Sequence, residues 1–245
     1  MITEDEGDRY ERQIRLFGRK GQERLKAAKV FVAGVGGLGS AICTYLAAAG
    51  VGTLRIVDGG MVERSNFNRQ FLFDDNDIGR VKVEVAAVRI GQINPSVRIE
   101  ALRETITNKN APELVGDCAI ILDAMDNYAA RYALNDAAWA MRIPFVHGAV
   151  DGFYGQVTTF VPGRTACLRC IVPADPPVRT LPVIGAFCGI IGSFEAAEAI
   201  KFLVGKGRLL ENRLLMLDGM NSVFEEVALR SDPNCRICGR GRSGR

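Results

Sequence analysis

Four cysteines fall into two pairs whose spacing suits a metal ion. Two residues separate Cys167 from Cys170, and two separate Cys235 from Cys238. This gap lets one turn of backbone present two thiolates to the same tetrahedral ion, and two such pairs supply four sulfur ligands. A site closed by four protein ligands leaves no position for a substrate. The pattern therefore predicts a structural zinc site and indicates that the chemistry lies elsewhere in the chain.

A glycine-rich segment follows the β-rich run at 29–33 and precedes a helical pattern at 38–49. Glycines favour a tight turn out of the strand, close approach of backbone N–H groups to phosphate, and close packing of the helix on the sheet. The helix N-terminus adds a preference for anions. The glycines that carry this prediction of a nucleotide loop are Gly34, Gly36, Gly37 and Gly39.

Charged and amide side chains follow the ends of the next predicted strands. Asp58 closes a strand at 53–57, at the distance where such folds place an acid on ribose hydroxyls. Fixed cations and amides suit a triphosphate, because charge builds on phosphoryl oxygens during transfer. An acid after the fourth strand, at the carboxyl edge of the sheet, suits Mg²⁺. The candidates for phosphate and magnesium are Asn66, Arg69, Gln70, Lys82 and Asp126.

The alternation of strands and helices predicts an α/β fold. We expect one Rossmann-like, doubly wound and mainly parallel sheet over 1–245, with antiparallel C-terminal strands and flexible ends at 1–8 and 240–245. The expected strands are 29–33, 53–57, 97–101, 118–122, 143–147, 156–161, 213–217 and 223–229. The expected helices are 9–28, 38–49, 79–93, 128–141 and 189–204, with a break near Gly18 and a proline-rich loop at 171–186.

Composition limits the classes of function. The chain has 245 residues, of which 48% are hydrophobic and 24% charged, typical of a soluble globular domain. The longest apolar run is too short and too glycine-rich for a membrane span, and a net charge of +3 does not indicate a nucleic-acid partner. An acidic N-terminus and an odd number of cysteines favour a cytoplasmic protein with reduced thiols.

Together, these ordered motifs resemble the MoeB/ThiF/HesA adenylyltransferases, relatives of the ubiquitin-activating enzymes. Besides the glycine segment and the cysteine pairs, the resemblance rests on Arg9-Tyr-Glu-Arg12-Gln, Gly50-Val-Gly-Thr-Leu-Arg-Ile-Val-Asp58, Ser65-Asn-Phe-Asn-Arg69-Gln, Gly79-Arg-Val-Lys82 and Asp123-Ala-Met-Asp126-Asn127. It implies that Asp58 binds ribose and that Asp126 binds Mg²⁺. The other residues implied in nucleotide binding are the four glycines of the loop and Asn66, Arg69, Gln70, Lys82 and Asn127, together with Asp126 itself. The resemblance also implies a homodimer in which Arg12 reaches the partner subunit's ATP site.

The reaction implied is attack by the C-terminal glycine carboxylate of a ubiquitin-fold sulfur carrier, ending in Gly-Gly, on the α-phosphate of ATP. An acyl-adenylate and pyrophosphate form, and a sulfur donor protein can then act on the activated tail. The sequence leaves open whether the carrier is of the MoaD or ThiS type, and so whether the pathway makes molybdopterin or thiamine, thiolates tRNA or modifies proteins.

The chain departs from the resemblance in one respect, and alternatives stay open. Relatives that form a covalent thiol intermediate carry a cysteine in the crossover loop, but 171–187 contains none, and we expect Cys188 to be a buried apolar residue. The sole histidine, His147, is expected to have a structural role. A nicotinamide oxidoreductase, a tRNA threonylcarbamoyladenosine dehydratase and an inactive partner subunit are the alternative functions.

Overall fold

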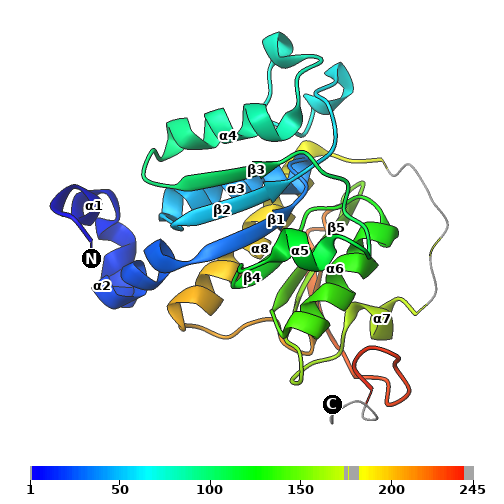
Figure 1. Cartoon of the computed structure of the whole chain (residues 1–245). Helices are drawn as coiled ribbons and strands as arrows, with labels where there is room; N and C mark the ends of the chain where they lie inside the picture. Colours follow the sequence, from blue (N-terminus) through cyan, green and yellow to red (C-terminus); the bar gives the residue numbers. More distant parts are fainter. Residues whose placement is uncertain (1, 174–175, 177–181, 240–245) are drawn as a thin grey trace.

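The computed structural model, which describes residues 2–173, 176 and 182–239, contains an eight-stranded sheet (Figure 1). The strands lie in the order β3-β2-β1-β4-β5-β6-β7-β8. The first five strands are parallel to one another, and β6, β7 and β8 each run antiparallel to the strand before them. Their bounds are β1 Lys29–Ala33, β2 Thr53–Val57, β3 Arg98–Leu102, β4 Ile120–Asp123, β5 Phe145–Asp151, β6 Tyr154–Phe160, β7 Arg213–Asp218 and β8 Val223–Ala228. This confirms the expected fold class.

Helices cover both faces of the sheet. Buried side chains of α2, α3, α4 and α8 form one hydrophobic cluster with the sheet, and those of α5 and α6 form a second cluster on the opposite face (Figure 1). The helices are α1 Glu4–Arg9, α2 Glu11–Ala27, α3 Gly37–Ala49, α4 Lys82–Ile93, α5 Ala111–Val115, α6 Tyr128–Met141, α7 Leu168–Ile171 and α8 Gly185–Val204, with 3-10 turns η1 Arg64–Asn66 and η2 Asp75–Asp77.

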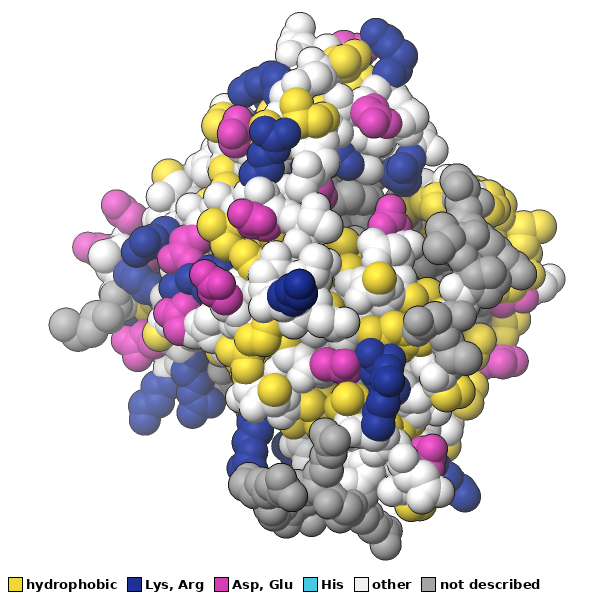
Figure 2. All heavy atoms as spheres, turned by 45° about the vertical axis from the view of Figure 1, so that its right-hand side comes forward, with side chains coloured by type: hydrophobic (Ala, Val, Ile, Leu, Met, Phe, Trp, Pro, Cys, Tyr) yellow, Lys and Arg dark blue, Asp and Glu magenta, His cyan; other side chains and the backbone are white. Residues whose placement is uncertain are grey.

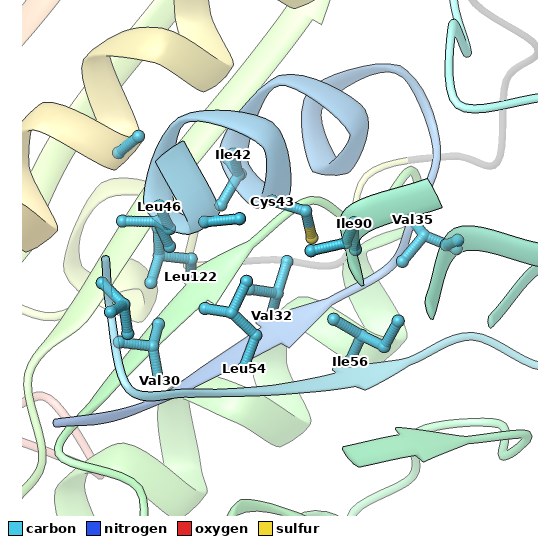
Figure 3. Packing of buried hydrophobic residues seen from close by; sticks show 14 of the residues in the cluster. Val30, Val32, Val35, Ile42, Cys43, Leu46, Leu54, Ile56, Ile90 and Leu122 are labelled. Atoms are coloured by element: carbon cyan, nitrogen blue, oxygen red, sulfur yellow. The ribbon is translucent and has the colours of Figure 1, made fainter. Parts of the chain in front are cut away.

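The central strands bury both of their faces. In β1, Val30 and Val32 belong to one cluster and Phe31 to the other, as the alternation of side chains along a strand requires. Figure 3 shows the first two pointing toward Ile42 and Leu46 of α3. Burial of each such side chain contributes about 1.5–3 kcal/mol. This packing fixes α3 against the strand that precedes the glycine loop.

Several elements differ from the sequence expectation. Helix α8 begins at Gly185, four residues before the expected start. A Cβ on Gly185 would lie 2.2 Å from the Asn68 oxygen, so the close approach of these two segments requires glycine at the first position of the helix. The expected flexible segment at 1–8 includes α1, which has a capping box between Thr3 and Glu6. The expected flexible tail at 240–245 lies outside the described residues.

The surface is mixed in charge on the face shown in Figure 2, where basic and acidic side chains alternate with hydrophobic ones. Among the described helices, none is both long enough and apolar enough to cross a bilayer.

Candidate active site

The glycine loop lies where the direction of the chain through the sheet reverses. After β1 the chain continues to β2 on one side, and after β4 to β5 on the other, so the loops that follow β1 and β4 border one crevice. Gly34 has φ 92°, and a Cβ there would lie 2.8 Å from the Ala124 oxygen of the β4 loop. A Cβ on Gly39 would lie 2.1 Å from the Gly34 oxygen. Both glycines are therefore required by the close approach of backbone segments.

Asp58 connects the end of β2 to the glycine loop. Its Oδ2 accepts the Val35 N–H at 3.0 Å, and its Oδ1 accepts the Gly60 N–H at 2.8 Å. The Lys82 side chain lies beside Gly60, as shown by the distance of 3.5 Å from its Cδ and Cε to the position of a Cβ on that glycine. The fold thus brings Asp58 and Lys82, which are distant in sequence, to one end of the loop.

Gln70 and Arg69 lie against the other side of the loop. Gln70 is buried, its Nε2 would be 3.7 Å from a Cβ on Gly36, and its Oε1 has no partner among the described residues. The Arg69 side chain passes Gly37, and its Nη1 donates to the Ser65 carbonyl at 2.9 Å. A polar ligand at the loop could provide the hydrogen-bond partner that the buried Gln70 Oε1 lacks. It could also bind the Arg69 guanidinium, which the Ser65 carbonyl orients.

Three other candidates have local hydrogen bonds of their own. Asn66 is buried, and its Oδ1 accepts the Glu63 N–H at 3.1 Å, so it closes the η1 turn. Asn127 caps α6, since its Oδ1 accepts the Ala130 N–H at 2.9 Å. Asp126 is exposed beside the crevice, and its Oδ1 accepts the Asn127 Nδ2–H at 3.2 Å. The Asp126 carboxylate therefore keeps lone pairs for a ligand.

Arg12 does not join these residues in the same chain. It is exposed on α2, and the adjacent Gln13 donates to the Ala49 carbonyl at 2.7 Å, at the end of α3 farthest from the glycine loop. Thirteen residues of α3, at about 1.5 Å per residue, separate the two ends by about 20 Å.

The four paired cysteines converge as the sequence predicted. Their sulfur atoms all lie within 4.8 Å of one another, although Cys170 and Cys238 are 68 residues apart in the chain. The Sγ–Sγ distances of 3.5 Å for Cys167–Cys235 and 3.2 Å for Cys170–Cys238 compare with about 3.8 Å for four sulfurs around a tetrahedral zinc. The donor set and its geometry fit Zn²⁺.

A family model described as the ThiF family matches residues 10–237. The chain belongs to the ThiF family. It is 42% identical over 242 residues to the SAMP-activating enzyme E1 of Haloferax volcanii, covering 96% of this chain and 89% of the relative. It is 41% identical over 250 residues to the sulfur carrier protein adenylyltransferase of Thermus thermophilus, covering 97% and 92%.

Other relatives are longer or more distant. The adenylyltransferase and sulfurtransferase MOCS3 of Drosophila ananassae is 40% identical, and this chain spans 55% of its length. Among solved structures, PaaA has a TM-score of 0.82 at 27% identity, covering 93% of this chain and 75% of its own. Escherichia coli MccB with ATP has a TM-score of 0.83 at 22% identity, covering 95% and 74%, which supports the fold alone. As a ThiF-family member, the chain is an adenylyltransferase of the ubiquitin-activating type.

In this ThiF-family chain, Cys188 is a buried thiol beside the nucleotide loop. It lies in the first turns of α8, and a Cβ on Gly37 would lie 2.7 Å from its Sγ. Burial raises the pKa of the Cys188 thiol to about 11, so the thiol is neutral at neutral pH. The expectation that Cys188 is buried is confirmed, and no sequence signal indicated that it would lie against Gly37.

Several buried ionisable side chains lie next to the end of β4, beneath the candidate site. His147 is buried and its Nδ1 lies 2.7 Å from Asp123 Oδ2, which is consistent with the structural role expected of it, and burial lowers the pKa of the imidazole. The sequence patterns did not indicate a role for Arg131 or Glu195. Burial, reinforced by the Asp123 charge, raises the pKa of Glu195, and neither of its carboxyl oxygens has a partner among the described residues. The available signal for Glu195 was that it is one of two acids, with Glu198, in an otherwise largely apolar helix.

Proposed function

We propose that this chain adenylates the C-terminal glycine carboxylate of a small ubiquitin-fold sulfur carrier of the MoaD or ThiS type. A carboxylate oxygen of the carrier attacks the α-phosphorus of ATP, the bond to the bridging oxygen breaks, and pyrophosphate leaves with that electron pair. The names of the two relatives that match over nearly their whole length, a SAMP-activating enzyme and a sulfur carrier protein adenylyltransferase, support a carrier substrate.

The observation that carries the proposal is the convergence of four side chains on the glycine loop. Asp58 and Lys82 meet at one end of the loop, and Arg69 and Gln70 lie along its other side. An acid at the end of β2 suits ribose hydroxyls, while a guanidinium and an ammonium suit phosphoryl oxygens. Fixed cations lower the barrier because negative charge increases on the phosphates and the leaving pyrophosphate during transfer.

The residues present also fit Mg²⁺. This ion prefers one or two protein carboxylates together with phosphate oxygens, and Asp126 offers an exposed carboxylate beside the crevice. When bound, Mg²⁺ would neutralise phosphate charge. Asn127 would act through Asp126, because its amide donates to that carboxylate while its oxygen caps α6.

A homodimer with Arg12 in the partner's ATP site is the second part of the proposal. Support comes from the distance between Arg12 and its own glycine loop, and from an apolar hollow of about 560 Å³ over α3 and α8. Tyr45 and Phe71 line this hollow, and these residues are 53% and 57% exposed. A second copy would cover apolar surface that a monomer leaves in water.

The test is carrier-dependent ATP–pyrophosphate exchange with purified carriers of the MoaD and ThiS types. Lys82→Ala and Asp126→Ala are each expected to lower the exchange rate about 10²- to 10³-fold, since each removes a preorganised charge contact. Lys20→Ala, which changes an exposed lysine of α2, is the control and should keep the parent rate. Parent-level exchange in both site variants would contradict the site, and absence of exchange with every carrier would contradict the substrate.

A further inference from the structure

The loop that carries Asp126 is held from behind by buried charged side chains. The Met125 N–H donates to Asp123 Oδ1 at 3.1 Å, and the Met125 carbonyl accepts from Arg131 Nη2 at 2.7 Å. Both polar groups of the Met125 backbone are therefore bound to one buried side-chain pair. Asp126 is the next residue in the chain.

The same pair ties this loop to the neighbouring strand. Arg131 Nη2 also donates to the Gly148 carbonyl of β5 at 3.2 Å, and its Nε lies 3.4 Å from Asp123 Oδ2. His147 Nδ1 donates to that carboxylate oxygen at 2.7 Å. Asp123 is 0% exposed and Arg131 only 7%, so these bonds form away from water, where a lost partner is costly.

The loop also contacts the glycine loop directly. The Ala124 N–H donates to the Ala33 carbonyl at 2.9 Å, and the Ala124 oxygen fills the place where a side chain on Gly34 would lie. A shift of the Met125 peptide would therefore move Asp126 relative to the nucleotide loop.

Two buried ionisable groups lie beside this pair. Burial and the charge of Asp123 raise the pKa of Glu195, and burial lowers the pKa of His147, so both shifts favour the uncharged forms. Among the described residues, Asp123 is the carboxylate that lies within ion-pair distance of the Arg131 guanidinium, at 3.4 Å from its Nε.

We propose that Arg131 and Asp123 are positioning residues for the nucleotide site, which fix the Met125 peptide and thereby the place of Asp126 beside the glycine loop. Neither side chain is proposed to touch ATP or the carrier. The inference rests on the proposed adenylation for its kinetic consequence, but its structural consequence can be measured without the reaction.

Arg131→Lys is the main test. A lysine keeps the charge but cannot bridge two carbonyls and a carboxylate with one planar group. Hydrogen–deuterium exchange should be faster in peptides covering 123–127 than in the parent. In carrier-dependent pyrophosphate exchange, kcat should fall about 10- to 100-fold, as for other groups that orient a ligand residue, with a smaller change in KM for ATP and a higher Mg²⁺ concentration for half-maximal rate.

Arg55→Lys is the matched control. Arg55 also joins a carboxylate, Glu100, to two backbone carbonyls, those of Leu114 and Val115, but on the other side of the sheet from α3 and α8. The Arg55→Lys substitution should lower the melting temperature. It should leave hydrogen–deuterium exchange at 123–127 and the Mg²⁺ dependence of the reaction unchanged. Asp123→Asn, close in shape to the parent, gives the same readouts should Arg131→Lys not fold.

The outcomes separate this inference from the proposed function. Parent-like hydrogen exchange at 123–127 in the folded variants, or loop effects equal to those of Arg55→Lys, would overturn the positioning role whether or not any carrier is adenylated. Faster exchange at 123–127 with unchanged kcat would show that the loop is held but that holding it does not serve catalysis, which also overturns the proposal. Faster loop exchange together with a selective loss of kcat supports it.

Discussion

Replacing Glu195 with glutamine should make the protein more stable, by an amount that grows with pH. Burial, and after it the negative charge of Asp123, raises the pKa of this carboxyl in the folded protein, whereas an unfolded glutamate has a pKa of about 4.3. Between these two pKa values the folded state keeps a proton that the unfolded state has lost. The free energy of unfolding of the parent therefore falls as pH rises through this window, by about 1.4 kcal/mol for each pH unit.

Glutamine cannot ionise, so Glu195→Gln removes this loss. Below pH 4.3 the two proteins should be similar in stability, because both hold a neutral side chain against Gly148. His147 acts in the opposite direction, since its lowered pKa costs stability as pH falls below about 6.5. That contribution is present in both proteins and cancels in their difference.

Urea unfolding at pH 5, 6, 7 and 8, followed by fluorescence of the single tryptophan, Trp139, measures this difference. Glu198→Gln is the control on the same helix. Glu198 accepts the Leu210 N–H at 2.8 Å and the Thr159 hydroxyl, so its replacement should destabilise the fold by about 1.5–3 kcal/mol. A stability difference between Glu195→Gln and parent that stays flat from pH 5 to 8 would refute the assignment of a buried neutral acid.

Two further predictions concern the metal and the subunits. Cys235→Ser should lose zinc by metal analysis and melt at lower temperature, since a cross-link between residues 68 apart is worth about 4 kcal/mol; full zinc content with an unchanged melting temperature would contradict this. Mixing inactive Arg12→Ala with inactive Asp126→Ala should restore up to about a quarter of the parent rate, because half of randomly exchanged dimers carry one intact site. If no activity returns after subunit exchange is demonstrated, Arg12 does not act across the dimer.

The fold and the front of the site could be predicted because their signals are local. The glycines indicate a turn, Asp58 marks the end of a strand, and the cysteine pairs have the spacing of metal ligands, and each of these signals lies within a few residues. The support behind the site could not, because Arg131 and Glu195 acquire their roles only when α6 and α8 pack against the end of β4. The expected start of α8 was four residues too late, and the contact of Gly185 with the Asn68 backbone is a tertiary contact that no local pattern shows.

Because Cys188 contacts Gly37, the rate of chemical labelling of its thiol can measure the motion of the nucleotide loop relative to α8. Because the sulfur faces the nucleotide loop and is only 2% exposed, a maleimide can reach it only when the start of α8 separates from that loop. The rate at which Cys188 is labelled, read by mass spectrometry of its peptide, therefore reports how often the loop opens. Slower labelling in the presence of nucleotide would show that the ligand holds the two segments together, without any probe added to the chain.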